Sequence, residues 1–246
     1  MLSAIREVEQ KKLEELKDTI KIRHGILTYR FEGNRNISGQ SLRAAVARLC
    51  PQYPQLAQRT SSGELIYRHP HVQYKSMDGM GVITALGEET GTLIEVFATL
   101  PEIFIGGNRI RIVEKKIEIQ DALFGPSNEE CEYVFTSPWF ALNQENEKIY
   151  SMSDEEARRG LLNRILKANL LSMAKGVGYF ISPQISATVN GQWSEAHSLF
   201  KGVRMRGIRC RFKARFRIPF LWGIGKSSSS GWGTTVPVAG GGRNVA

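Results

Sequence analysis

The sequence predicts an α+β fold of two tandem ferredoxin-like (βαββαβ) domains, of which the second is degenerate. The first observation is the order of predicted elements in the first half, β, α, β, β, α, β, which is the split βαβ motif. The second is that a strand, a long helix, a hairpin and a last strand follow in the second half. The third is size, because 246 residues with 41% hydrophobic content suffice for one large domain or two small ones. The two-domain interpretation therefore depends on the element order.

Strand and helix signals in the first half are local and distinct. The run Ile20 to Phe31 is rich in β-branched and aromatic residues, as in a central strand. Ser38 is a good N-cap for a helix that ends before Pro51. The remaining predicted elements are strands at Leu65 to Lys75 and Gly81 to Leu86 around an Asp78-Gly79 turn, a helix at Thr92 to Thr99, and a strand with a bulge at Asn108 to Gln120.

The second half reads as the same motif with one helix shortened or lost. Ser153 and Glu156 form a capping box for a long helix that should run to about Ala174. The other predicted elements are a strand at Glu132 to Leu142, a hairpin at Ile185 to Ile218 and a last strand at Thr234 to Val238.

This order divides the chain into four predicted segments. Residues 1–19 form a charged extension, with apolar residues at helical spacing over Ile5 to Asp18. Residues 20–125 form the first ferredoxin-like domain, with a candidate catalytic strand. Residues 126–239 form the second domain, with a basic hairpin and a glycine-rich loop, and residues 240–246 form a flexible tail.

The balance of charges predicts an anionic partner. There are 33 Lys and Arg against 24 Asp and Glu, a net charge of +9, which favours nucleic acid over an anionic membrane surface. No stretch approaches the roughly 20 apolar residues of a membrane span, and no signal-peptide core is visible. We therefore expect a soluble, cytoplasmic protein. Cys50, Cys131 and Cys210 are odd in number and far apart, so neither a disulfide framework nor a thiolate zinc site is indicated.

A glycine-framed run, Gly223 to Gly233, precedes the predicted last strand. Glycines let a backbone approach a ligand, and consecutive peptide N–H groups in such a loop bind anions. The end of a P-loop is imitated by Gly225-Lys226-Ser227, but Phe220 stands where that motif needs its first glycine. A flexible surface loop is the plain alternative. The residues expected to contact phosphates are Gly223, Gly225, Lys226, Ser227, Ser228, Ser229, Ser230, Gly231 and Gly233.

The segment from Lys201 to Arg217 holds eight cations and no acid. The last five cations alternate with apolar residues, so a strand here would have one cationic face and one apolar face. A solvated basic face is the plain alternative, but like charges along one face repel each other, which favours an anionic partner. The residues expected to contact nucleic acid are Arg204, Arg206, Arg209, Arg211, Lys213 and Arg215.

Two motifs resemble a known family. The pattern Gly-x-Gly-Lys-x-x-x-x-Gly-aromatic-Gly, after a hairpin and before a last strand, resembles the signature loop of the RAMP superfamily, in particular of CRISPR RNA-processing endoribonucleases. The stretch His69-Pro70-His71-Val72-Gln73-Tyr74-Lys75 resembles the Pro-x-aliphatic-Gln-Tyr-Lys strand of one branch of these enzymes. The resemblance implies paired ferredoxin-like domains whose groove holds a CRISPR repeat RNA, with the loop and the basic hairpin gripping it.

The resemblance also sets expectations for partners. Precursor CRISPR RNA and its product, crRNA, are the expected ligands. Other CRISPR-associated proteins, in an effector complex or as reverse transcriptase and integrase modules, are further candidates, since some relatives are fused to such modules. No cofactor and no membrane partner are expected.

Metal-independent RNA cleavage uses the substrate's 2′-hydroxyl as nucleophile and leaves a 2′,3′-cyclic phosphate and a 5′-hydroxyl. The protein supplies proton transfer, for which histidine is suited, and a cation for the phosphorane. In the predicted strand, His69, His71 and Lys75 share one face. The resemblance implies a histidine after the first helix and a lysine downstream, which His69 and Lys75 match best, with His71 second. Relatives carry a tyrosine on the first helix; here Tyr67 or Tyr74 would substitute, or the role is absent.

Other interpretations carry less weight. His24 is expected to be a structural histidine with satisfied hydrogen bonds, and His197 a solvated residue of the hairpin. Zinc held by His69 and His71 is disfavoured, because no cysteine or carboxylate converges on them in sequence. Two binding functions stay open, a non-catalytic RAMP subunit that binds guide RNA in an effector complex and a generic RNA-binding module.

Overall fold

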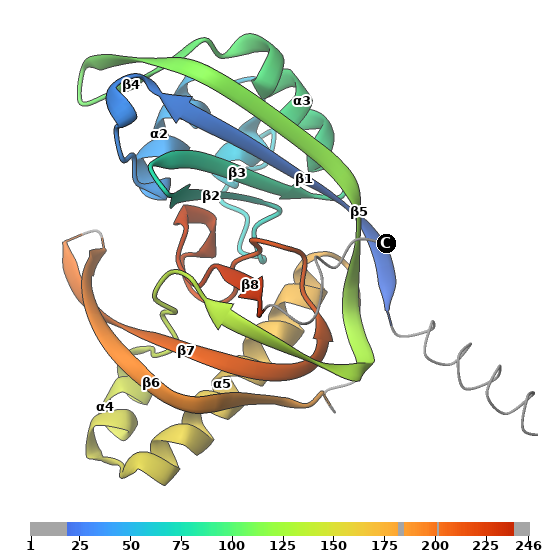
Figure 1. The fold of residues 1–246 in the computed structure, drawn as a ribbon, viewed down its shortest axis with the longest axis vertical. Helices are drawn as coiled ribbons and strands as arrows, with labels where there is room; N and C mark the ends of the chain where they lie inside the picture. Colours follow the sequence, from blue (N-terminus) through green and yellow to red (C-terminus); the bar gives the residue numbers. More distant parts are fainter. Residues whose placement is uncertain (1–18, 182–184, 201, 239–246) are drawn as a thin grey trace, which may run out of the picture.

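The computed structural model describes residues 19–181, 185–200 and 202–238 (Figure 1). The helix predicted over Ile5 to Asp18 and the predicted tail lie outside these residues. Within the described ranges, no helix is both long enough and apolar enough to cross a membrane.

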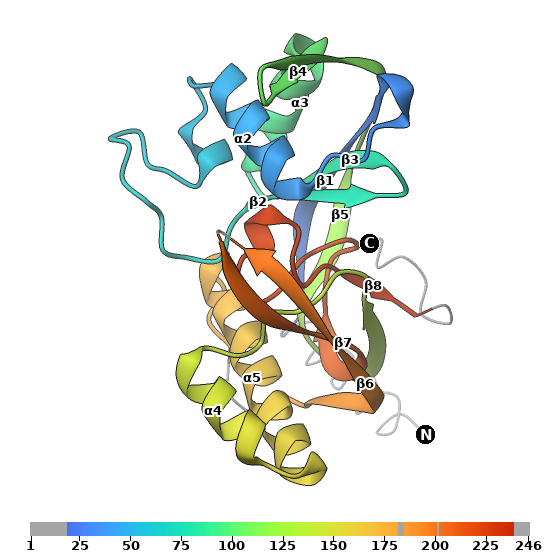
Figure 2. The ribbon, with the colours of Figure 1, turned by 90° about the vertical axis from the view of Figure 1, so that its left-hand side faces the viewer.

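The first half forms the predicted ferredoxin-like unit. Four strands pair antiparallel in the order β2-β3-β1-β5. Both helices cover one face of this sheet (Figure 2), and their apolar side chains form one core with Leu27 and Tyr29 of the first strand. The bounds are β1 (Ile20–Phe31), α2 (Gly39–Leu49), β2 (Val72–Met77), β3 (Met80–Leu86), α3 (Glu89–Thr99), β4 (Glu102–Ile105) and β5 (Asn108–Phe135).

In the second half, the ferredoxin-like unit lacks its second helix. The end of β5 lies between β7 and β8, and β7 also pairs with β6. Where the second helix would stand, between β7 and β8, the described chain has only a short 3-10 turn, as predicted. The bounds are α4 (Gln144–Met152), α5 (Glu155–Gly176), β6 (Ala187–Phe200), β7 (Val203–Arg217), η3 (Ser228–Ser230) and β8 (Thr235–Pro237).

A single long strand joins the two sheets. The sequence predicts separate strands at Asn108 to Gln120 and Glu132 to Leu142, but β5 is continuous and bends where its partner changes from β1 to β7 (Figure 1). Gly125, with φ of 110°, lies at this change of partner. The predicted bulge is confirmed, because the pairing with β1 skips Val113.

The strand predicted from Leu65 starts only at Val72, so His69 and His71 do not lie on it. The side-chain amide of Gln58 donates to the carbonyl oxygens of Ile66 and Arg68, each at 2.9 Å, and this holds the preceding segment in a loop. We call residues 58–71 the strap, since they cross from α2 to β2 along the second domain.

The long helix α5 begins one residue later than the predicted capping box. The Asp154 carboxylate, not the Ser153 hydroxyl, accepts the N-cap hydrogen bond, from the N–H of Ala157 at 2.9 Å. The hydroxyl of Ser153 instead donates to the carbonyl oxygen of Ile149 at 2.7 Å, at the end of the separate helix α4. At Ser38, by contrast, the predicted cap is confirmed.

Candidate active site at the domain interface

The glycine run forms hydrogen bonds that connect the two domains. Figure 1 shows it, in red, between the two sheets. The N–H of Gly223 donates to Oε1 of Gln73 on β2 at 2.7 Å, and Nε2 of Gln73 returns a hydrogen bond to the Gly223 carbonyl oxygen at 3.0 Å. The serines of η3 are buried. Lys226, at the tip of the run, is exposed, and Gly225, Ser227, Gly231 and Trp232 are half-buried. Contact between the run and RNA stays a prediction, and Lys226 is the exposed residue through which it would be made.

Beneath the run lies a buried polar cluster. The indole N–H of Trp222 donates to Nε2 of His69 at 3.0 Å. The ammonium of Lys75, only 2% exposed, donates to Gln73 Oε1 at 2.9 Å and to Thr84 Oγ1 at 3.1 Å. Burial lowers the pKa of Lys75 well below its ordinary value. Lys75 is thus enclosed between the domains, and it lines none of the described pockets.

Burial also determines the protonation state of His69. Desolvation first, and then the charges of His71 and Lys75, lower the pKa of His69 to about 3, so the imidazole is neutral near pH 7. Because Nε2 accepts from Trp222, the proton lies on Nδ1.

The other predicted catalytic residues point elsewhere. His71 places Nε2 2.7 Å from the Gly176 carbonyl oxygen and Nδ1 3.5 Å from a carboxylate oxygen of Glu89. Burial raises the pKa of Glu89, but the hydrogen bond and charge of His71 outweigh it, and the pKa lies below its ordinary value. Tyr74 lies on the opposite face of β2, in the first-domain core, where its hydroxyl donates to the Leu56 carbonyl oxygen at 3.0 Å.

A pocket of about 490 Å³ opens where the strap, α5 and the tip of the glycine run meet. His69 is the one predicted catalytic residue in its lining, and Tyr67, 93% exposed, lies beside it. Oδ1 of Asn169 accepts the indole N–H of Trp139 at 2.9 Å, and within the described ranges the amide N–H groups of Asn169 make no hydrogen bond. The lining is Gln58, Tyr67, Arg68, His69, Pro70, Asn169, Ser172, Gly225, Lys226, Ser227, Ser228 and Ser229. Sequence reasoning missed Gln58, Arg68, Asn169 and Ser172, because no motif marks them.

The alternation of β7 is confirmed, and several of its cations pair with acids from other segments. Its apolar residues are buried from Ile208 onward, and Arg209, Arg211 and Arg215 are exposed. Glutamates from β5 and elsewhere pair with several of the cations, so the charges of this face are partly neutralised. The pairs are Arg206 with Glu147 and Glu195, Arg211 with Glu132, Lys213 with Glu130, and Arg217 with Glu129.

His24 departs from its prediction. It is 1% exposed, and neither ring nitrogen has a hydrogen-bond partner among the described residues. Its ring lies edge-on to Trp222, with centroids 6.2 Å apart. Burial, and then the charge of Lys75, lower its pKa to about 4. In the described part of the chain, no three residues among His, Cys, Asp and Glu are grouped so as to hold a metal ion.

These observations define a protein of two ferredoxin-like domains with an open, cation-bearing pocket where the second domain's glycine run meets the first domain. The Cas6b N-terminal domain model matches residues 20–122, and the Cas6b C-terminal domain model matches residues 125–238. The chain belongs to the Cas6b family.

Two solved structures described as Cas6b are similar to this chain. A crystal structure of Cas6b is 30% identical, with a TM-score of 0.79, and covers 89% of this chain and 100% of that one. A second, described as CRISPR RNA processing endoribonuclease Cas6b, is 28% identical with a TM-score of 0.70, over 89% of this chain and 100% of its own. An uncharacterized protein of Methanocaldococcus jannaschii is 31% identical over 144 residues, 58% of this chain and 97% of that protein.

Proposed function

We propose that this chain cleaves precursor CRISPR RNA within its repeats, by attack of the 2′-hydroxyl and without a metal ion, to give 2′,3′-cyclic phosphate and 5′-hydroxyl ends. The observation that carries the proposal is the pocket between strap and glycine run, which brings His69 together with the exposed ammonium of Lys226. The family and the description of a solved relative as a CRISPR RNA processing endoribonuclease support the substrate.

Within this proposal His69 is the general base. A neutral imidazole can accept the 2′-hydroxyl proton at Nε2 while the bond from O2′ to phosphorus forms and the bond from phosphorus to the 5′-oxygen breaks. The departing 5′-oxygen takes its proton from water, because the Nδ1–H of a neutral imidazole is too weak an acid to supply it. Its Nε2 must then exchange the Trp222 hydrogen bond for the substrate, and an anionic phosphate nearby would raise the pKa of His69. Lys226 and Arg68 supply positive charge to the phosphorane. Lys75, enclosed under the run, positions Gln73 rather than contacting RNA.

The test is cleavage of end-labelled repeat RNA under single-turnover conditions in EDTA. We expect full activity in the chelator, and a loss of at least about 100-fold in the rate constant for His69→Ala, in line with the usual size of acid-base catalysis. His71→Ala is the matched control, because His71 faces Glu89 and not the pocket. Loss of activity in EDTA would overturn the metal-free mechanism, and a dead His71→Ala beside an active His69→Ala would overturn the site.

The second candidate is a guide-RNA-binding subunit without catalysis. The hydrogen bond that occupies Nε2 of His69 is the observation that favours it. Such a subunit would bind the repeat and leave it intact in the same assay.

A further inference from the structure

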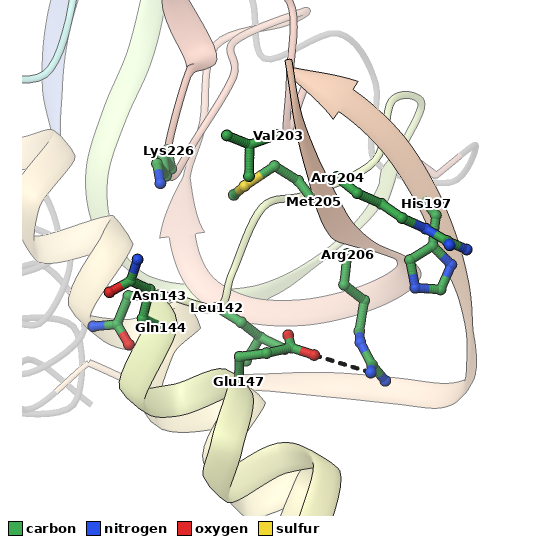
Figure 3. Close-up of a pocket in the computed structure, with 10 residues that line it drawn as sticks. All are labelled: Leu142, Asn143, Gln144, Glu147, His197, Val203, Arg204, Met205, Arg206 and Lys226. Atoms are coloured by element: carbon green, nitrogen blue, oxygen red, sulfur yellow. Dashed lines mark ion pairs between the residues drawn. The ribbon is translucent and has the colours of Figure 1, made fainter. Parts of the chain in front are cut away.

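A second pocket, of about 810 Å³, lies between the start of α4 and the β6–β7 hairpin (Figure 3). Lys226 lines both this pocket and the pocket that contains His69, so the two sites share that side chain. The lining is Leu142, Asn143, Gln144, Glu147, His197, Val203, Arg204, Met205, Arg206 and Lys226.

Part of this lining is aliphatic and open to solvent. Figure 3 shows Val203 and Met205 of the hairpin side by side, whereas Leu142, before α4, is only 5% exposed. Val203 is 59% exposed, although it belongs to a paired strand. Val203 and the half-buried Met205 give this concave site an aliphatic surface, which suits a flat apolar group of a ligand.

The charges of the pocket favour an anion. The guanidinium of Arg206 is held by Glu147 at 2.9 Å and by Glu195 at 2.7 Å, so these three charges are satisfied within the protein. Arg204 and Lys226 are exposed and make no ion pair within the described ranges. What remains is a positive charge on two sides of the aliphatic surface.

Two amides at the start of α4 add directed hydrogen bonds. Oδ1 of Asn143 caps the helix by accepting from the N–H of Asn146 at 2.8 Å, which leaves its amide N–H groups as donors. Gln144, next to it in Figure 3, offers both a donor and an acceptor. Donors and acceptors beside a flat apolar surface match the edge and the face of a nucleobase.

We propose that this pocket binds one unpaired nucleotide of the substrate RNA adjacent to the cleaved bond. The base lies on the aliphatic surface, Asn143 and Gln144 read its edge, and Arg204 and Lys226 hold its phosphates. The assignment of this pocket to the nucleotide next to the cleaved bond rests on the proposed function, because Lys226 lines both this pocket and the pocket that contains His69. The amide N–H groups of Asn143, which the helix cap does not use, favour a base whose edge presents a hydrogen-bond acceptor.

The test is binding of repeat RNAs that carry a 2′-deoxynucleotide at the cut, so that none is cleaved, and an abasic site at one unpaired position at a time. Wild-type protein should lose roughly tenfold in affinity at one position near the cut. The double variant Asn143→Ser, Gln144→Ala should bind the intact RNA that much more weakly and lose the sensitivity to that abasic site. Serine keeps the helix cap, so α4 stays formed.

Asn128→Ser, an exposed amide in β5 outside the pocket, is the control and should behave as wild type. The proposal would be overturned if the abasic site and the double variant each lowered the affinity for RNA and their effects added. Equal affinity for all abasic RNAs would also overturn it. Binding of a free mononucleotide as tight as that of the RNA would also overturn it. Because no cleavage is measured, an inactive protein that still senses the base would overturn the proposed function and leave this pocket standing.

Discussion

At the scale of single residues, the most unusual feature is the group of protonatable side chains buried under Trp222. His24, His69 and Lys75 come from three parts of the first domain and meet below the glycine run. The pKa of each is lowered there, because burial disfavours the charged form of each side chain.

The stability of the protein should therefore fall in mild acid. His24 has a folded pKa of about 4 against 6.5 for the unfolded chain, so the unfolded chain binds more protons between these values. Stability is then lost as the pH falls through 6.5 towards 4, by about 2 kcal/mol at about pH 5 for this residue. Urea unfolding of His24→Leu should show a pH dependence that is smaller by this amount. His197→Gln, at an exposed position, is the control, and an unchanged slope in His24→Leu would contradict the argument.

At the same scale, the sequence identified part of the candidate site. His69 and Lys226 were both predicted, one from the Gln-Tyr-Lys stretch and one from the glycine run, and they line one pocket. Lys75 was predicted as the lysine downstream of the histidine, and Tyr74 as a substitute for the tyrosine that relatives carry on the first helix. Alternation along a strand assigns them to opposite faces, but it cannot say that one face is core and the other is sealed by a second domain.

At the scale of elements, the N-cap of α5 shows why this helix begins one residue later than the sequence predicts. Ser153 and Asp154 are both good N-caps, and the sequence does not rank them. Because a separate helix ends just before, the Ser153 hydroxyl is used at Ile149 and Asp154 takes the cap.

Removing the two side chains should separate these roles. Asp154→Ala should lower the free energy of unfolding by about 1 kcal/mol, because the N–H of Ala157 in the first turn loses its partner and the helix dipole loses an anion. Ser153→Ala should cost less than half of that. Urea unfolding of both variants at one pH is the measurement, and the reverse order would restore the predicted capping box.

The basic strand β7 gives a second prediction at this scale. Arg209 and Arg215 are exposed and make no ion pair with the described residues, whereas Lys213 lies 3.0 Å from Glu130. The double variant Arg209→Gln, Arg215→Gln should weaken RNA binding and reduce the slope of log affinity against log salt by about 1.5. Lys213→Gln should change the slope less, because Glu130 already competes for its charge. Equal effects at all three positions would show that an ion pair within the protein does not reduce the contribution of a cation to RNA binding.

At the scale of the whole molecule, the two domains are joined by close backbone contact. A Cβ at Gly39, at the start of α2, would collide with the carbonyl oxygen of Tyr74 and lie 2.7 Å from that of Ser230 in η3. The first turn of α2, the strand β2 and the glycine run thus meet at one point, and only glycine leaves room there.

Gly39→Ala should loosen this junction. We expect a loss of about 1–3 kcal/mol in the free energy of unfolding, the usual cost of overpacking, with faster hydrogen exchange in η3 and β2. Gly160→Ala, in α5 with nothing within 4 Å of the added Cβ, is the matched control and should stabilise the protein by about 0.5–1 kcal/mol. A Gly39→Ala variant as stable as wild type would contradict the close contact.

The sequence by itself determined the fold class, most of the order of the elements, the missing helix and the alternation of the basic hairpin, because these depend on local periodicity, caps and turn residues. It did not predict the helix α4 or the continuity of β5. It singled out the run Gly223 to Gly233. The tertiary structure decided where that run lies, since most of it is buried, Gly223 is hydrogen-bonded to Gln73 of the first domain, and Lys226 is its exposed residue. It likewise decided which histidine lines a pocket and which cations are already paired, because burial and ion pairing depend on residues that are distant in sequence.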